Sequence, residues 1–587
     1  MSNIWRRRTE PATSRCGPGR GRRSSPRVRL HGAHKSSIEA VRGRLLLGAG
    51  LFAVGFFVLS LRLVEVALFN EVRPPSAASD GVDIDVGPAR ADIVDLNGLL
   101  LATSLTARSL YANPRDVRDS ANAAARLGAV LPELDQRTVR EKLSSAKQFV
   151  WLKRHLTPRE VAAVNALGEP GFDFLEEQRR IYPHGSLLAH AVGYGKLDNR
   201  GLGGLERAFD ERLLAFPGKP LITSIDLRFQ HVMRDELARA VLMYRPAGAV
   251  GIILDIASGG LRAIVSLPDF NPNEEGRVDP DALFNRATLG AYEMGSTFKI
   301  FTTAMALETG VATLQDEFDA SQPLRLSGEV IKDFHGEGRW LSVPEIFIHS
   351  SNIGSAKMAL AVGANMQREF LERLRLLDRS QLEVGELAVP LYPSKWREIN
   401  TATIGFGHGI AVSPAQLCAG VAALINGGLW RPLTLLAKNE KLNLSGKRVV
   451  SAATSGAMRQ MLRLAVTHGT GRNAEVSGYL VGGKTGTAEK VGSKGYDHQR
   501  ILSSFVGVFP IMAPRYLVFA MLDEPIGTPA TQGRATGGWT AAPVVGRVIA
   551  RIGPMIGIAP EGEPAVEDGF GATVIKLDGD EIRLAAY

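Results

Sequence analysis

At 587 residues, 45% of them hydrophobic, the chain is long enough to form two or more domains with substantial cores. Its two cysteines, Cys16 and Cys418, cannot build a disulfide framework, and neither they nor the 11 histidines show the spacing of a metal site. The composition therefore excludes a disulfide-rich scaffold, and we expect no metal and no cofactor.

The positive charge is concentrated at the start of the chain. The formal net charge is +9, and residues 1–44 hold 12 Lys and Arg against Glu10 and Glu39, so the rest of the chain carries about −1 (9 − 10). Nucleic-acid-binding proteins usually spread such charge over a folded face, whereas this segment is rich in Gly, Pro, Ser and Arg. We expect a disordered, basic cytoplasmic tail over 1–44 and no nucleic-acid partner.

An uncharged run, LLLGAGLFAVGFFVLSL, follows over residues 45–61. As a helix it would be about 26 Å long, which suits a thin or locally pinched bilayer core. A buried soluble helix would rarely be apolar on every face, and a cleaved signal peptide would need small residues where Arg62 and Glu65 stand. We predict an uncleaved transmembrane anchor over 45–65, with the amino terminus in the cytoplasm and the remaining chain outside it.

A domain is expected over 66–222, and from about 82 to 222 it alternates short apolar strands with helical stretches. Asn97-Gly98 lies between two apolar runs and predicts a hairpin. Residues 116–166 are typical of amphipathic helices, one of which begins with a capping box formed by Thr157 and Glu160. Because no catalytic constellation occurs here, we expect a pedestal domain that is structural or binds partners.

A second unit is expected over 223–555, and within it the segment 248–268 predicts a hairpin joined at Ser258-Gly259-Gly260. This order of strands, helices and strands predicts a sheet whose first and last parts pair, covered by a cluster of helices. The last segment, 556–587, is either a hairpin turning at Asp578-Gly579-Asp580 or a loose tail. The helical patterns fall at 296–309, 343–361 and 413–426, and the later strand patterns at 479–488, 502–509 and 516–522.

The first candidate for chemistry lies in AYEMGSTFKIFTTAMALETG, residues 291–310. Ser296 and Lys299 are three residues apart on a predicted helix, so their side chains lie on one face. Ser296 begins that helix, where free N–H groups favour a developing oxyanion. Lys299 could remove the serine proton only if burial or a second cation lowers its pKa. A serine that merely caps the helix is the alternative.

HSSNIGSAKMAL, residues 349–360, is the second element. It places Ser350 and Asn352 at the start of an apolar helix. Ser350 could relay a proton and Asn352 could orient the lysine or a substrate amide, although helix capping alone also explains both residues.

The third element is Lys-Thr-Gly-Thr within GYLVGGKTGTAEK, residues 478–490. As a strand it directs Lys484 and Gly486 to one side and Thr485 and Thr487 to the other. Lys484 supplies a second cation, which can bind a substrate carboxylate and keep Lys299 neutral. Gly486 is expected to leave space for a substrate backbone to pair along the strand.

The same letters match the phosphate-binding pattern G-x-x-x-x-G-K-[ST]. A phosphate loop leads from a strand into a helix, but TGTAEKVGSKGYDHQR after Lys484 has no apolar stripe. The three elements, in this order, instead match the known motif set of serine acyl-enzymes that act on penicillin. We therefore assign the lysine to an acyl-enzyme.

These elements stand in the phrases YEMGSTFK, SSNIGSAKMA, IGFGHGIAVSPAQL, GGKTGTA and SFVGVFP. Together they resemble a class B penicillin-binding protein, most closely the FtsI type that cross-links septal peptidoglycan. The Ser-Ser-Asn form is similar to the septal branch. The resemblance implies a multidomain α+β fold with a single N-terminal transmembrane helix, an α/β pedestal domain and a serine penicillin-recognising transpeptidase domain. That last domain would have an antiparallel sheet flanked by helices plus an all-helical subdomain.

The resemblance also implies roles for the site residues. Ser296 would be the acylated nucleophile and Lys299 its general base, while Ser350 and Asn352 would assist proton transfer and substrate positioning. The backbone N–H groups of Ser296 and Thr487 would form the oxyanion hole. Carboxylate binding would fall to Lys484 and Thr485, and the implied substrate-binding residues are Lys484, Thr485, Gly486 and Thr487.

The implied reaction is two-step acyl transfer on the stem peptides of lipid II-derived peptidoglycan strands, with β-lactams trapped at the same serine. The implied location is the bacterial inner membrane, with a periplasmic catalytic domain, beside an FtsW-like glycosyltransferase and other divisome proteins. An elongation-type class B transpeptidase is the nearest alternative. A class A β-lactamase would be shorter and would need a deacylating glutamate. A non-catalytic β-lactam or muropeptide sensor, or a divisome scaffold, would not need the pair Ser296 and Lys299.

Overall fold

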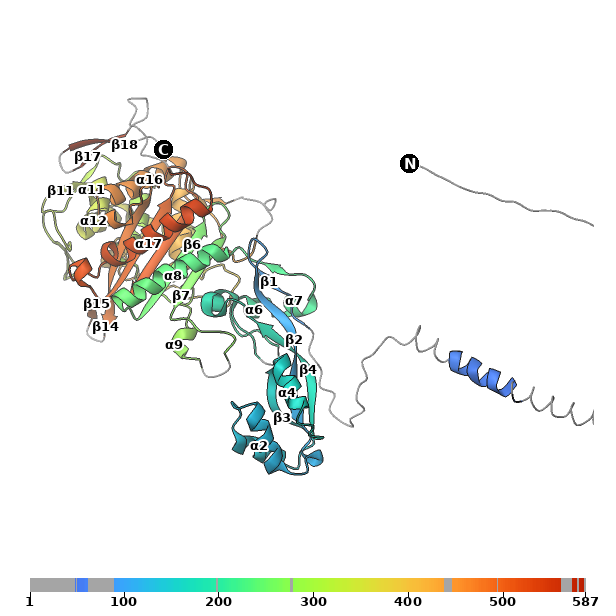
Figure 1. Ribbon diagram of the computed structural model, residues 1–587. Coiled ribbons are helices and arrows are strands. Elements are labelled where there is room, and N and C mark those ends of the chain that lie inside the picture. The colour runs from blue at the N-terminus through green and yellow to red at the C-terminus, as the bar shows by residue number, and fades with distance from the viewer. Residues whose placement is uncertain are drawn as a thin grey trace, which may run out of the picture. The chain divides into compact units, whose positions relative to one another are not determined.

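The computed structural model describes residues 48, 50–61, 89–196, 199–274, 278–437, 446–492, 495–560, 573–577 and 580–584 (Figure 1). Residues 50–61 are helical, and the chain from Asp85 onward forms a separate compact unit. No helix in the described ranges is both long enough and apolar enough to cross a membrane. The tail predicted over 1–44 lies outside these ranges. Of the anchor predicted over 45–65, residues 48 and 50–61 are described, and the others lie outside these ranges.

The pedestal is built around one long strand, β2 (Leu100–Ala112). Strands β1 (Ile93–Val94), β3 (Val150–Leu156) and β4 (Phe172–Ile181) pair with β2 in antiparallel fashion, and β5 (Leu221–Ile222) pairs in parallel with β1. The Asp95 carboxylate accepts hydrogen bonds from the backbone N–H groups of Asn97 and Leu99, and Gly98 has a φ of 85°. The hairpin predicted at Asn97-Gly98 is therefore confirmed.

Three helices pack beside this sheet. They are α2 (Ser120–Val130), α3 (Gln136–Leu143) and α4 (Pro158–Asn165), and α4 begins with the predicted capping box between Thr157 and Glu160. The prediction of amphipathic helices over 116–166 is wrong for β3, which is a strand. Its side chains contribute Leu152 and Leu156 to the pedestal core through pairing with β2, a long-range contact that local periodicity does not reveal.

A buried charge cluster fixes the pedestal helices against β1. The guanidinium groups of Arg90 and Arg180 both donate to the Glu206 carboxylate, and Arg90 also donates to Asp210. Because Glu206 is fully buried, losing either arginine would leave charge uncompensated in the core. The short helices in this region are α5 (Ala189–Val192), α6 (Gly204–Ala208) and α7 (Asp210–Ala215), with the turns η1 (Pro114–Asp116) and η2 (Gly185–Leu188).

The second part of the unit is centred on a five-stranded antiparallel sheet. Its order is β14 (Gly482–Gly492), β15 (Gly495–Phe509), β16 (Tyr516–Asp523), β6 (Gly248–Asp255) and β7 (Leu261–Leu267). Strands from the two ends of this part pair side by side, as predicted. β14, the strand that carries the Lys-Thr-Gly-Thr element, lies at an edge of this sheet.

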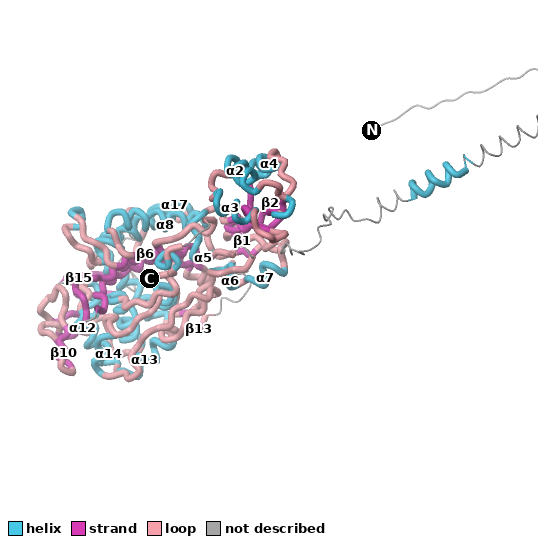
Figure 2. Tube along the Cα trace, turned by 90° about the horizontal axis from the view of Figure 1, so that it is seen from below, coloured by secondary structure: helices cyan, strands magenta, loops and turns pink. Residues whose placement is uncertain are grey.

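Each face of this sheet is covered by helices, as Figure 2 shows for α8 and α17 on one side of β6 and α12, α13 and α14 on the other. Along β6, Val250 and Ile252 enter one core while Ala249 and Ile253 enter the opposite core, which is the alternation expected of a strand buried on both faces. Helices α8 (Leu227–Tyr244) and α17 (Gly537–Met555) line the second core. The first core is formed by α10 (Lys299–Glu308), α11 (Val343–Ile348), α12 (Asn352–Val362), α13 (Ala364–Arg373), α14 (Glu398–Ile404), α15 (Pro414–Ile425) and α16 (Ala452–Thr467).

The helix predicted over 343–361 is two helices, α11 and α12. The break falls at Ser350, whose φ of 60° is incompatible with a continuous α-helix. The C-terminal hairpin is confirmed, because β17 (Thr573–Leu577) pairs with β18 (Asp580–Leu584) and Leu577 is buried. The remaining elements are α9 (Pro280–Leu283), η3 (Gly295–Phe298), β8 (Glu317–Asp319), β9 (Leu324–Leu326), β10 (Glu329–Ile331), β11 (Trp340–Ser342), β12 (Leu429–Trp430), β13 (Lys447–Arg448), η4 (Arg472–Ala474) and η5 (Pro529–Thr531).

Candidate active site

Ser296 lies in the short turn η3, immediately before α10. The preceding residue, Gly295, has a φ of 53°, and a Cβ there would lie 2.4 Å from the carbonyl oxygen of Thr487. Glycine is therefore required at 295 both for backbone conformation and for space. This close approach brings the backbone of the Ser296 turn against strand β14.

Lys299 reaches back to Ser296 along the same helical face, as the spacing predicts. Its Nζ lies 3.1 Å from the Oγ of Ser296 and 2.8 Å from the Oδ1 of Asn352. The side chain of Lys299 is fully buried. A primary amine in this position can exchange a proton directly with the serine hydroxyl.

Ser350 joins the two lysines. Its Oγ lies 3.0 Å from the Nζ of Lys299 and 3.0 Å from the Nζ of Lys484. A non-glycine residue with positive φ carries strain of about 1 kcal/mol or more. The break between α11 and α12 thus places a hydroxyl between the two lysines at a cost in backbone energy.

Asp333 holds the start of α12 in place. Its carboxylate accepts hydrogen bonds from the Oγ of Ser351 and from the backbone N–H groups of Asn352 and Ile353. The amide nitrogen of Asn352 donates to the carbonyl of Lys332, so the amide oxygen is left to face Lys299. The sequence alone does not point to Asp333, because it is a single acidic residue in a loop with no helical or strand pattern.

The Lys-Thr-Gly-Thr element lies on β14 as a strand. The Nζ of Lys484 contacts Ser350 and the carbonyl of Thr485, and it lies 5.8 Å from the ring centre of Phe347. On the opposite side of the strand, the Oγ1 of Thr485 lies 2.6 Å from the Oγ1 of Thr470. Because the strand continues to Gly492 and does not lead into a helix, the phosphate-loop alternative is excluded.

The predicted reason for glycine at 486 is wrong. A Cβ at this position would lie 2.3 Å from the Oγ of Ser504, 2.8 Å from the Cγ2 of Thr297 and 2.9 Å from the carbonyl oxygen of Met294. The absence of a side chain therefore makes room for the protein itself and lets the Ser296 turn pack closely on β14. The side chain of Thr487 is held in position by a hydrogen bond, which its Oγ1 accepts from the backbone N–H of Gly537.

The charge state of the site follows from burial. Desolvation, and then the neighbouring Lys484 ammonium, hold the pKa of Lys299 well below its usual range, against a smaller opposing effect of Asp333. Desolvation alone lowers the pKa of Lys484 to about 7. A neutral Lys299 beside a positively charged Lys484 is the arrangement that a general base and a carboxylate-binding cation require.

The described residues thus bring Ser296, Lys299, Ser350, Asn352 and Lys484 together from three segments of the chain. These are the side-chain types, at hydrogen-bond distances, that nucleophilic catalysis by a serine requires. Two family models match the sequence: the penicillin-binding protein transpeptidase domain over residues 249–550 and the penicillin-binding protein dimerisation domain over residues 85–224.

Among relatives, the chain is 40% identical to a "Probable peptidoglycan D,D-transpeptidase FtsI" of Caulobacter vibrioides, over 89% of this chain and 90% of the relative. It is 29% identical to "Peptidoglycan D,D-transpeptidase FtsI" of Escherichia coli, over 89% of this chain and 92% of the relative. The fold is similar to that of penicillin-binding protein 3 from Mycobacterium tuberculosis, solved with ampicillin, with a TM-score of 0.65 and 22% identity over 82% of this chain and 98% of that one. The chain belongs to the class B penicillin-binding proteins of the FtsI type.

Proposed function

We propose that the chain is a peptidoglycan D,D-transpeptidase that cross-links stem peptides at the division septum and that β-lactams inhibit. The family membership and the activity named for the FtsI relatives support this function. The single observation that carries the mechanism is the contact between the Nζ of buried Lys299 and the Oγ of Ser296. The hydroxyl of Ser350 connects Lys299 to Lys484.

In the first half-reaction, neutral Lys299 removes the proton from Ser296. The serine Oγ attacks the carbonyl carbon between the two terminal D-alanines of a stem pentapeptide. The backbone N–H groups of Ser296 and Thr487 stabilise the oxyanion, since the two segments touch at Gly295. The C–N bond then breaks, the leaving amine receives the proton through Lys299 and Ser350, and D-alanine departs.

In the second half-reaction, an amine of a neighbouring stem attacks the ester carbonyl. The new C–N bond forms, the ester C–O bond breaks and the proton lost by the amine returns to Ser296 through Lys299. Lys484 and Thr485 bind the terminal carboxylate of the pentapeptide in the first step. A β-lactam carboxylate occupies the same place, and the opened ring stays attached to Ser296.

The catalytic unit is held outside the cytoplasm by the anchor over 45–65, in the inner membrane with the amino terminus inside. The apolar run and its cationic flank support this orientation. We further propose that the pedestal contacts an FtsW-like glycosyltransferase and other divisome proteins, since no catalytic constellation occurs in its sequence. Depletion in cells separates the septal from the elongation role: filaments support the septal role, and round cells would favour the alternative.

The direct test is transpeptidation by the purified full-length protein. With a stem pentapeptide donor and an amine acceptor, wild type should release D-alanine and form cross-linked product, and Ser296→Ala should do neither while keeping its thermal unfolding transition. Binding of β-lactam without any D-alanine release in wild type would instead support a sensor. Rapid hydrolysis of the antibiotic would support a β-lactamase.

A further inference from the structure

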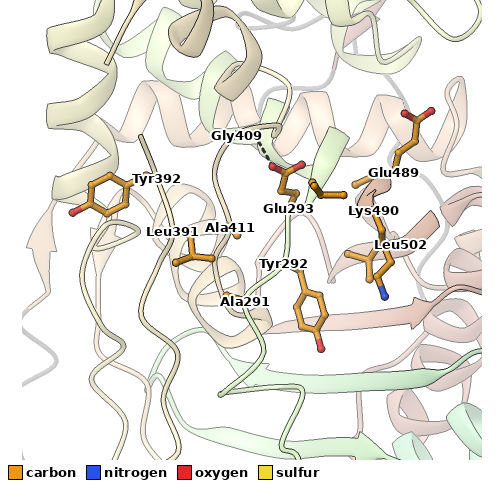
Figure 3. A pocket seen from close by; sticks show the side chains of 12 residues that line it. Ala291, Tyr292, Glu293, Leu391, Tyr392, Gly409, Ala411, Glu489, Lys490 and Leu502 are labelled. Atoms are coloured by element: carbon orange, nitrogen blue, oxygen red, sulfur yellow. Dashed lines mark hydrogen bonds between the residues drawn. The ribbon is translucent and has the colours of Figure 1, made fainter. Parts of the chain in front are cut away.

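A pocket of about 490 Å³ lies beside the catalytic serine turn (Figure 3). Two segments already described form one wall: Ala291 to Glu293, just before Ser296, and Ala488 to Val491, just after the Lys-Thr-Gly-Thr element. The remaining lining residues are Leu391, Tyr392, Gly409, Ala411 and Leu502. We call this the side pocket. It adjoins the proposed acylation site where Gly295 packs on Ala488, since a Cβ added at Gly295 would lie 3.0 Å from the Cβ of Ala488.

The side pocket contains a half-buried carboxylate with only neutral partners. Glu293 accepts a hydrogen bond from the backbone N–H of Gly409, shown as a dashed line in Figure 3, and one from the hydroxyl of Tyr496. Burial raises the pKa of Glu293. Among the residues that the structure describes, no Lys, Arg or His forms an ion pair with Glu293, whose partners are Gly409 and Tyr496.

The other charged groups in the pocket wall already have counter-ions. Glu489 pairs with His498, and its carboxylate points away from that of Glu293 in Figure 3. Lys490 pairs with Asp523, the last residue of β16, and with Glu524, which follows it. Glu293 is therefore the lining carboxylate that lacks a cation, and a half-buried carboxylate is stabilised most by a cation that a ligand brings.

The edge strand indicates which part of a ligand reaches this pocket. If Lys484 and Thr485 bind the donor carboxylate, the donor peptide runs antiparallel to β14, with its amino-terminal part extending past Thr487. An extended peptide pairs along an open strand edge, and each residue advances about 3.3 Å. The side chain of the residue before the acylating D-alanine then lies opposite Ala488 to Lys490, next to Glu293.

We propose that the side pocket binds the acyl-donor stem through an amino-terminated side chain, held as an ammonium ion by the Glu293 carboxylate. This inference rests on the proposed function. The methylene groups of such a side chain would pack on Leu391 and Tyr392 at the pocket rim. Because a protonated amine is not a nucleophile, the same contact keeps the donor's own amine out of the second half-reaction and leaves attack to the amine of the other stem.

The test compares two synthetic thioester donors on the full-length protein. Both end in D-alanine thioester, and the preceding residue carries either a terminal amine or a methyl group in its place. The acylation rate of Ser296 is followed by intact mass, and only enzyme that benzylpenicillin can titrate is counted. Wild type should prefer the amine donor by about tenfold or more, the value of one charge-assisted hydrogen bond.

Matched variants assign the preference. Glu293→Gln keeps the shape of the side chain and should reduce the preference to within about threefold, the range left when a charged hydrogen bond becomes neutral. Glu489→Gln removes the other lining carboxylate and should leave the preference for the amine donor unchanged. Tyr496→Phe leaves the charge of Glu293 in place and should also leave this preference unchanged. Equal acylation by both donors in wild type, or a preference that survives in Glu293→Gln, would overturn the assignment. Failure of both donors to acylate titratable Ser296 would instead contradict the proposed function.

Discussion

The hydroxyl of Ser350 lies 3.0 Å from the amine of Lys299 and 3.0 Å from the amine of Lys484. One lysine comes from the helix that carries the nucleophile and the other from an edge strand, and the hydroxyl between them belongs to a residue with a φ of 60°. Two ammonium groups around one hydroxyl repel each other, so this geometry favours one neutral lysine. Burial and the neighbouring Lys484 ammonium both hold the pKa of Lys299 well below its usual range, which favours Lys299 as the neutral lysine.

Ser350 therefore serves both proton transfer and geometry, and two substitutions separate these roles. Ser350→Ala and Ser350→Gly both remove the hydroxyl, so both should slow acylation by fluorescent penicillin about 100-fold or more. Glycine relieves the positive-φ strain, so Ser350→Gly should be more stable than Ser350→Ala by about 1 kcal/mol in chemical denaturation. Equal stabilities would show that the backbone at 350 is unstrained.

Asp333, whose carboxylate binds the first N–H groups of α12, influences the pKa of Lys299. Its charge raises that pKa, so Asp333→Asn should lower it further, and the acid limb of the acylation pH profile should move to lower pH. The variant also weakens the contacts at the helix start, which should cost about 0.5–2 kcal/mol of stability. Rates of acylation measured across pH test the first effect; an acid limb that stays in place or moves to higher pH would contradict it.

Lys484 should lower stability at neutral pH. Its pKa is about 7 in the folded state and near 10.4 when unfolded, so the unfolded chain binds more protons between those values. The wild type should therefore gain stability as pH rises through this window, by up to about 1.4 kcal/mol per pH unit. Lys484→Met should lack this gain and be more stable than wild type at pH 7, with the difference shrinking toward pH 10.

Denaturation of both proteins at several pH values tests this prediction, because the titrating groups that do not interact with Lys484 cancel in the comparison. A difference that is constant with pH would contradict the depressed pKa. The same variant should lose acylation, since the carboxylate of the antibiotic loses its cation.

Gly486 is required for packing of the serine turn. In Gly486→Ala the new methyl group meets Ser504, Thr297 and Met294 at 2.3–2.9 Å, which should destabilise the protein by about 1–3 kcal/mol and impair acylation. Gly492→Ala, on the same strand, is the control, since its nearest contact is an ordinary 3.5 Å. Melting temperatures and penicillin labelling of the pair test this; equal effects of the two substitutions would show that close packing at 486 is unimportant.

The sequence predicted much of this site because its motifs are local. Ser296 and Lys299 share one helical face, and the alternation around Lys484 is that of a strand, so each fragment could be interpreted alone. Their convergence was inferred from the resemblance to a family. No periodicity could have supplied it, because the contacts join segments more than 50 and 130 residues apart.

What the sequence could not reveal depends on tertiary contacts. The polar and apolar residues of β3 are compatible with a helix, and only the pairing with β2 makes this segment a strand. Asp333 and Glu293 are single acidic residues whose importance appears only when α12 and the side pocket are formed. The pattern around Gly486 predicts close approach of another group to the strand, but it does not identify that group as Ser504, Thr297 and Met294.

The most direct test of the central claim is peptide mass mapping of the full-length protein after reaction with benzylpenicillin. We predict a single stoichiometric adduct on Ser296, absent in Ser296→Ala and strongly slowed in Lys299→Met. An adduct on any other residue, or undiminished labelling of Ser296→Ala, would contradict the account.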